Sequence, residues 1–216
     1  PRVTDGRRWG ALLNGRFVRF AAFISLIFVA MYVAFPLAPN YLQDVGGWRL
    51  AQIGALGSFQ ALGNALLNPF LGHLADNDRK DSDRRGRWAK ARGLIVGPTL
   101  VWGSVLALLL ARNLPILILA FLLRGAYHGC RSLVQARATG LAREADRGLV
   151  LGASETVIAV AQVAAPYLAG WLYAGEPTYP FLAALVLIPI VLAGSMAAGG
   201  LVTRRRSLGE QARLGS

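Results

Sequence analysis

Residues 72–87 read Gly72-His73-Leu74-Ala75-Asp76, a charged stretch, and then Arg84-Arg85-Gly86-Arg87. This segment separates two apolar stretches, residues 50–73 and 93–111, each about as long as a helix that crosses a membrane. A segment with many charged side chains between two such stretches lies in water. We therefore expect residues 72–87 to form a loop at a membrane surface. The rest of the chain is therefore interpreted as a series of membrane-spanning helices.

The composition favours the same class of protein. Of the 216 residues, 55% are hydrophobic and only 16% are charged, and the mean hydropathy is +0.46. A soluble domain carries about 25% charged residues. We therefore expect a membrane protein that crosses the bilayer several times. The chain begins with Pro1 and not with methionine, from which we expect a fragment of a longer protein.

The residue patterns of several enzyme classes are missing from the sequence. The only histidines are His73 and His128, and the single cysteine, Cys130, lies inside an apolar segment, so neither a metal site nor an internal disulfide is expected. No glycine-rich phosphate loop follows a strand, and no Ser–His–acid set stands at an exposed turn. We therefore expect neither an enzyme nor a bound cofactor.

Six apolar segments have the length of a membrane-crossing helix: residues 17–39, 50–73, 93–111, 114–136, 149–173 and 180–202. Long apolar runs fit helices and not the alternating strands of a barrel. We expect an all-α membrane fold with six transmembrane helices in residues 17–202. Residues 1–16 are expected to be a basic cytoplasmic lead or a linker between domains, and residues 203–216 a cytoplasmic tail.

The basic residues predict the orientation of these helices. They gather before the first span, between the second and third, between the fourth and fifth, and after the sixth, whereas the opposite loops hold only Arg49 and Arg112. Cytoplasmic loops carry the excess of Lys and Arg, so both termini are expected in the cytoplasm of a protein in the cell membrane. This distribution accounts for the net charge of +12 without a nucleic-acid partner.

A polar stripe follows the fourth span. Arg124, His128, Arg131 and Gln135 fall at i, i+4, i+7 and i+11, within an arc of about 60° on a regular helix. One arginine at mid-helix costs about 2.5–3.5 kcal/mol on insertion scales, so two on one face are expected to face other helices or a water-filled cavity. The stripe fits a substrate or proton pathway, and it also fits polar pairing that holds the helices together.

The fifth span carries a matching pair of polar residues, Glu155 and Gln162, on one face. Glu155 and Arg131 lie about 8 Å inside the cytoplasmic ends of neighbouring antiparallel spans, at 1.5 Å per residue. We expect the two to form an ion pair, since a paired charge costs less to keep in a membrane. The alternative is that Glu155 is protonated and alone, as a proton carrier.

In the second span, Gln60, Asn64 and Asn68 are interpreted as packing amides, with Gly54, Gly57 and Gly63 allowing close helix approach.

The segment 72–87 resembles the G-x-L-a-D-r-x-G-r-r loop of the major facilitator superfamily, a family of secondary transporters. The positions that match are Gly72, Leu74, Ala75, Asp76, Gly86 and Arg87. The chain departs from the pattern in one respect. Gly86 lies ten positions after Asp76, whereas the family has the corresponding acid and glycine about three positions apart. Family members also commonly carry an arginine in the fourth helix, in a pattern R-x-x-q-G, which Arg124 and Gly129 match in part.

This resemblance implies two six-helix halves, each built from two three-helix inverted repeats, with substrate bound between the halves near the midplane. The chain would then be one half. Its basic lead and its end soon after the sixth span favour the C-terminal half, whereas the signature loop is typical of the N-terminal half. The implied partners are the other half, membrane lipid and a small solute, with a proton as a candidate coupling ion.

The expected function is solute transport by alternating access. Arg124, His128 and Gln162 are the expected substrate or coupling contacts, and Arg131 with Glu155 the buried pair. The expected cytoplasmic gate comprises Gly72, Asp76, Arg84, Arg85, Gly86 and Arg87. The alternative is a six-helix membrane scaffold without transport activity, or a protein that acts only as a homodimer.

Overall fold

The computed structural model describes residues 15–80, 92–141 and 144–194, and all regular structure in these ranges is helical. This confirms the predicted all-α class. The helices are α2 (Gly15–Tyr32), α3 (Ala38–Asp44), α4 (Leu50–Lys80), α5 (Arg92–Leu110), α6 (Leu114–Arg124), α7 (Ala126–Leu141), the short 3₁₀ helix η3 (Glu144–Asp146), α8 (Arg147–Gly175) and a last helix, Tyr179–Gly194.

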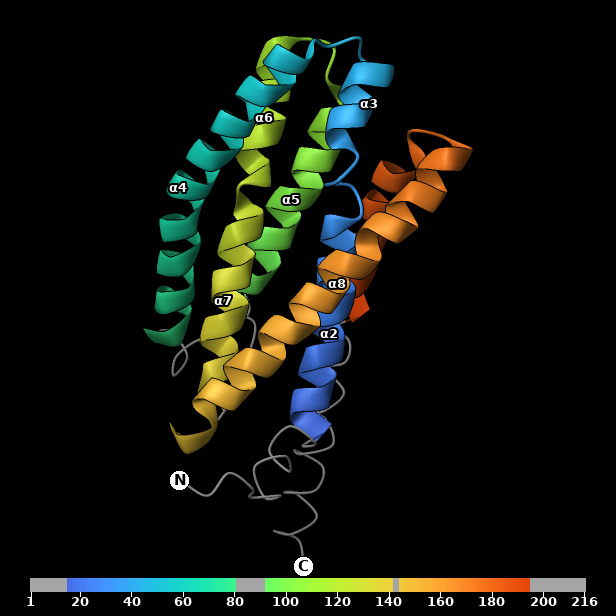
Figure 1. Ribbon diagram of the computed structural model, residues 1–216. Coiled ribbons are helices and arrows are strands. Elements are labelled where there is room, and N and C mark those ends of the chain that lie inside the picture. Colours follow the sequence, from blue (N-terminus) through green and yellow to red (C-terminus); the bar gives the residue numbers. More distant parts are fainter. Residues whose placement is uncertain (1–14, 81–91, 142–143, 195–216) are drawn as a thin grey trace, which may run out of the picture.

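The long helices pack side by side into one bundle (Figure 1). Helix α4 packs against both α6 and α7, α5 packs behind them, and α2 packs along α8. Large apolar side chains fill the centre, among them Ile24 and Phe28 of α2, Leu117 of α6 and Phe181 of the last helix. Every long helix contributes to this main apolar core, and a second, smaller cluster joins Phe17, Ala138 and Val150.

Two helical segments in the described ranges are long and apolar enough to cross a membrane, Leu114–Thr139 and Arg147–Gly175. Three further apolar helices are shorter, Phe17–Tyr32, Ile95–Leu110 and Tyr179–Gly194. Helix α4 has 31 residues, but its amides and its charged end lower its hydropathy.

The first predicted span does not form one helix. Helix α2 ends at Tyr32, a turn occupies residues 33–37, and α3 follows. Pro36 explains the break, because it lacks an N–H group and disfavours the helical conformation of the residue before it, Phe35. Pro39 then stands in the first turn of α3, where a missing N–H costs nothing. The break leaves backbone carbonyls near the middle of the bundle outside any helix.

The second span extends beyond its predicted end at residue 73, since α4 continues to Lys80. The loop predicted at residues 72–87 was therefore wrong in its first part. Hydropathy marks where a segment leaves the lipid and not where its helix ends. A helix continues into water until a helix-breaking residue stops it. Residues 73–80 contain no glycine or proline, so the helix continues through them. The remainder of that segment lies outside the described residues.

The fourth span is divided at Gly125, where α6 ends and α7 begins. At this point α4 and the α6–α7 pair meet backbone to backbone: a methyl group on Gly125 would overlap backbone atoms of Gly63 and Asn64, and one on Gly63 would overlap the backbone of Leu122. Small residues permit such contact between helices in membranes. Gly54 and Gly57, which were expected to serve the same purpose, have no neighbour within 4 Å.

Candidate functional site

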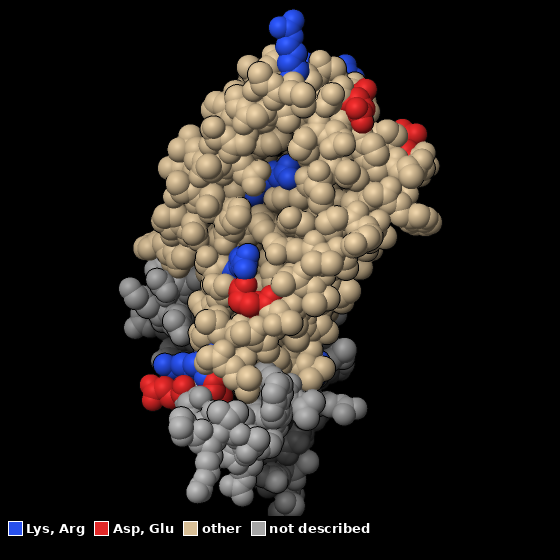
Figure 2. Space-filling view, in the orientation of Figure 1, with Lys and Arg blue, Asp and Glu red and all other residues tan. Residues whose placement is uncertain are grey.

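Charged side chains interrupt the apolar middle of the bundle on one face. Figure 2 shows basic groups at two places there, with acidic groups beside one of them, whereas the other charges lie near the two ends. Within the described spans, the charged residues of this middle zone are Arg124 of α6, Arg131 of α7 and Glu155 of α8. Each is held by different contacts.

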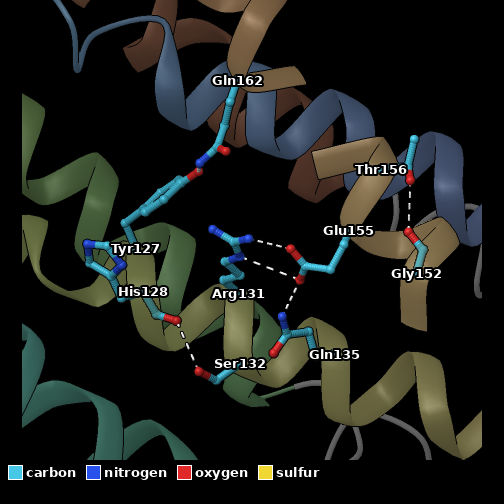
Figure 3. Close-up of polar contacts among 9 residues, drawn as sticks. All are labelled: Tyr127, His128, Arg131, Ser132, Gln135, Gly152, Glu155, Thr156 and Gln162. Atoms are coloured by element: carbon cyan, nitrogen blue, oxygen red, sulfur yellow. Dashed lines mark hydrogen bonds and ion pairs between the residues drawn. The ribbon is translucent and has the colours of Figure 1, made fainter. Parts of the chain in front are cut away.

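Arg131 and Glu155 form an ion pair between α7 and α8 (Figure 3). Arg131 donates through Nη2 to Oε2 of Glu155, and its Nε lies 3.5 Å from Oε1. Gln135, one turn further along α7, also donates to Oε1. The structure thus brings together the pair expected from the sequence and adds Gln135 to it. The ion pair is only partly buried, since 39% of the Arg131 side chain and 28% of the Glu155 side chain are exposed.

Arg124 has no acidic partner among the described residues. Its Nη2 donates to the carbonyl oxygen of Phe35 at 2.7 Å, which is one of the carbonyls released by the break after α2. Its guanidinium carbon lies 3.9 Å from the centre of the Phe35 ring and 5.4 Å from that of Phe121. Its Nε is buried and meets no hydrogen-bond acceptor in the described part of the chain.

Tyr127, which lies between Arg124 and Arg131 in the sequence, links α7 to α2 and α8, and sequence reasoning missed it. Its ring contacts those of Phe28, Tyr32 and Phe35, with centroids 5.0–5.8 Å apart. Its hydroxyl accepts a hydrogen bond from Nε2 of Gln162 at 2.8 Å, so Gln162 points into the bundle toward α7 (Figure 3). A signal was present, because Tyr127 follows Arg124 by three residues and precedes Arg131 by four, which is the spacing of neighbours on a helix face.

His128 does not join this group. It is exposed, and its ring meets the ring edge of Tyr127 at a centroid distance of 5.6 Å. Gly125 keeps helical dihedral angles (φ −56°, ψ −24°), so the four residues of the expected stripe lie on one helical segment, Leu114–Thr139. Their contacts nevertheless differ, because Arg124 lies against aromatic rings whereas Arg131 and Gln135 bind Glu155.

The expected gate residues are placed only in part. Gly72 lies in α4, with no neighbour within 4 Å of an added methyl group. The backbone of Asp76 belongs to the last turns of α4. The side chain of Asp76 lies outside the described residues, as do Arg84, Arg85, Gly86 and Arg87.

A family model described as the Major Facilitator Superfamily matches residues 20–214. The chain belongs to the major facilitator superfamily. It is therefore a membrane transporter of the major facilitator type in general terms, and its family is one of transporters and not of enzymes. Comparisons with curated proteins and with solved structures gave no match. The resemblance read from residues 72–87 and from Arg124 is thus confirmed at the level of the superfamily.

Proposed function

We propose that the chain forms one six-helix half of a secondary transporter that moves a small solute by alternating access. The observation that carries the proposal is the partly exposed set of polar side chains from α6, α7 and α8 in the middle of an apolar bundle. Charged groups at that depth are costly in lipid, and they mark solute or ion pathways when they face a cavity. In this proposal Arg124 and Gln162 contribute to the pathway, with His128 at its exposed edge.

The second half would cover the face on which these groups lie. Large apolar side chains on that part of the molecule are exposed, including Leu66 and Phe70 of α4 and Val163, Tyr167 and Trp171 of α8. Apolar side chains on a membrane protein face either lipid or another helical domain. We place the partner half against α4 and α8, where it would enclose the polar groups between two bundles.

The orientation belongs to the same proposal. Both termini and residues 72–87 would lie in the cytoplasm, where Asp76 and the nearby arginines act as a gate, and the six spans would form two three-helix inverted repeats. Cysteines introduced at Ser82 and Ser207 should react with an impermeant maleimide only from the cytoplasmic side, and one at Gly175 only from outside. Labelling of residue 82 from outside would overturn the orientation.

The function is tested by uptake. The complete gene product, reconstituted in vesicles with an imposed proton gradient, should accumulate at least one solute from a panel of organic anions, sugars and amino acids. Residues 1–216 alone should not, because one half cannot enclose a pathway. Uptake by the monomeric 216-residue chain would refute the half-transporter proposal. Absence of uptake by the folded complete product would favour the scaffold alternative.

A further inference from the structure

The last helix, Tyr179–Gly194, carries a proline in its interior, Pro189. In a regular helix the N–H group of residue 189 would donate to the carbonyl oxygen of Leu185, four positions earlier. Proline has no N–H group, so this carbonyl has no partner within its own helix. Lipid cannot supply a donor, and an unpaired carbonyl is costly there. Another part of the protein therefore has to provide the donor.

A tryptophan of α5 supplies this donor. Nε1 of Trp102 donates to the carbonyl oxygen of Leu185 at 2.9 Å, between residues 83 positions apart in the sequence. An indole N–H donates and cannot accept, so a carbonyl without a partner suits it. The hydrogen bond is partly buried, and both side chains pack against the main apolar core. The bond thus connects α5 to the last helix at the carbonyl that Pro189 leaves unpaired.

The first span contains a second case of this arrangement. Pro39 lacks the N–H group that would reach the carbonyl of Phe35 in a continuous helix, and Nη2 of Arg124 donates to that oxygen at 2.7 Å. The same carbonyl accepts from the Ala38 N–H at 3.4 Å, and there the chain leaves the helix. The last helix, by contrast, continues through its proline. A helix that continues through a proline is a place where bending is expected.

The packing of the last helix differs on the two sides of Pro189. Phe181, Ala184 and Ile188, which precede the proline, are completely buried. Residues 189–194 are exposed or only partly buried. The part before the proline is therefore fixed by the core and by Trp102, whereas the part after it is held less firmly.

We propose that Trp102 and Pro189 form a joint in the last helix. The indole of Trp102 holds residues 179–188 to α5, so that these two elements move as one body. The part after the proline bends relative to them, because residue 189 makes no hydrogen bond back to the preceding turn. The inference concerns the mechanics of the bundle and does not depend on the transport function.

The hydrogen bond is tested by a double-mutant cycle on the unfolding equilibrium of the complete gene product in mixed micelles. Trp102→Phe leaves the carbonyl of Leu185 without a donor, so it should raise the unfolding equilibrium constant by about 5- to 150-fold. Pro189→Ala gives that carbonyl an N–H partner, so in its background the effect of Trp102→Phe should be smaller by about fivefold or more. The matched control is Pro166→Ala in α8, which concerns the carbonyl of Gln162. It should leave the effect of Trp102→Phe unchanged to within about twofold.

The bending is tested by the distances between spin labels on α5 and on the last helix. Labels at the exposed positions Thr99 and Ala193 report on the part after the proline. Pro189→Ala should narrow their distance distribution, because the added N–H group completes the helix across residue 189. Labels at the exposed positions Leu110 and Leu182 report on the part before the proline, and their distribution should be narrow with and without Pro189→Ala.

Equal effects of Trp102→Phe in the wild-type and Pro189→Ala backgrounds would overturn the joint, since the two residues would then act independently. A distribution after the proline that Pro189→Ala leaves unchanged would overturn the bending, and so would an equally broad distribution before the proline. If Trp102→Phe alone does not fold, recovery of the fold on adding Pro189→Ala supports the joint. Failure of that double variant to fold, while Pro189→Ala alone folds, overturns it.

Discussion

The ion pair between Arg131 and Glu155 makes the sharpest energetic prediction. Replacing either residue by glutamine removes one charge and leaves the other in the bundle. The two variants are not equivalent, because Glu155 keeps the hydrogen bond from Gln135 when Arg131 is replaced. Arg131 has no second carboxylate among the described residues, so Glu155→Gln should be the more damaging single change.

The size of the effect follows from the exposure of the pair. Breaking a fully buried ion pair costs about 3–5 kcal/mol, whereas an exposed pair contributes about 0–1 kcal/mol. Here the side chains are 39% and 28% exposed, so water screens part of the interaction. We expect each single change to lower the free energy of unfolding by about 1–3 kcal/mol, with a coupling energy of about 1–2 kcal/mol between the two sites.

The assay is a double-mutant cycle on the free energy of unfolding, measured by denaturant titration in mixed micelles. The matched control is the surface pair Arg147–Glu144, with N–O separation 3.6 Å and side chains 56% and 87% exposed, whose coupling should be at most about 0.5 kcal/mol. Additive effects of Arg131→Gln and Glu155→Gln, within about 0.5 kcal/mol, would refute the reasoning. A coupling equal to that of the surface pair would refute it as well.

Three further changes test other parts of the molecule. Gly125→Val should prevent α4 from meeting α6–α7 and abolish the folded, monodisperse protein in gel filtration, whereas Gly57→Val, at a glycine with open surroundings, should leave it intact. Tyr127→Phe should lower the free energy of unfolding by about 1 kcal/mol, because Gln162 loses its acceptor, and the companion change Gln162→Leu should remove most of that cost. Asp76→Asn should reduce uptake by the complete product about 5- to 30-fold at equal surface expression, if a gate contact worth 1–2 kcal/mol is lost, and unchanged uptake would leave Asp76 as an ordinary surface acid.

Hydrophobic periodicity and the positions of the charged residues were enough to predict the helical class and which residues lie at the same depth in neighbouring helices. The helical class followed from the long apolar runs, and the proximity of Arg131 and Glu155 followed from their equal depth in neighbouring antiparallel spans. Both inferences use only the rise per residue and the order of the spans. The same reasoning had no means to detect that Gln135 shares the carboxylate, since an amide on that face fits several partners.

The features that escaped prediction depend on where helices break and meet. Arg124 takes its acceptor from Phe35, a contact between residues 89 positions apart that exists only because the backbone leaves the helix before Pro36. Tyr127 was overlooked because its ring counts as apolar when polar stripes are sought, although its hydroxyl is the partner of Gln162. The extension of α4 to Lys80 was missed because hydropathy reports the edge of the lipid and not the end of the helix.

The position of the ion pair along the chain has a consequence for biosynthesis. Arg131 leaves the ribosome 24 residues before Glu155, which takes about 1–5 s at the usual 5–20 residues per second. During that interval the arginine must reach the translocon without its carboxylate, whereas the Phe35 carbonyl that receives Arg124 has already been made. Nascent chains stalled when α7 has left the ribosome but Glu155 has not would therefore hold α7 less firmly in the bilayer than chains stalled after α8 has emerged.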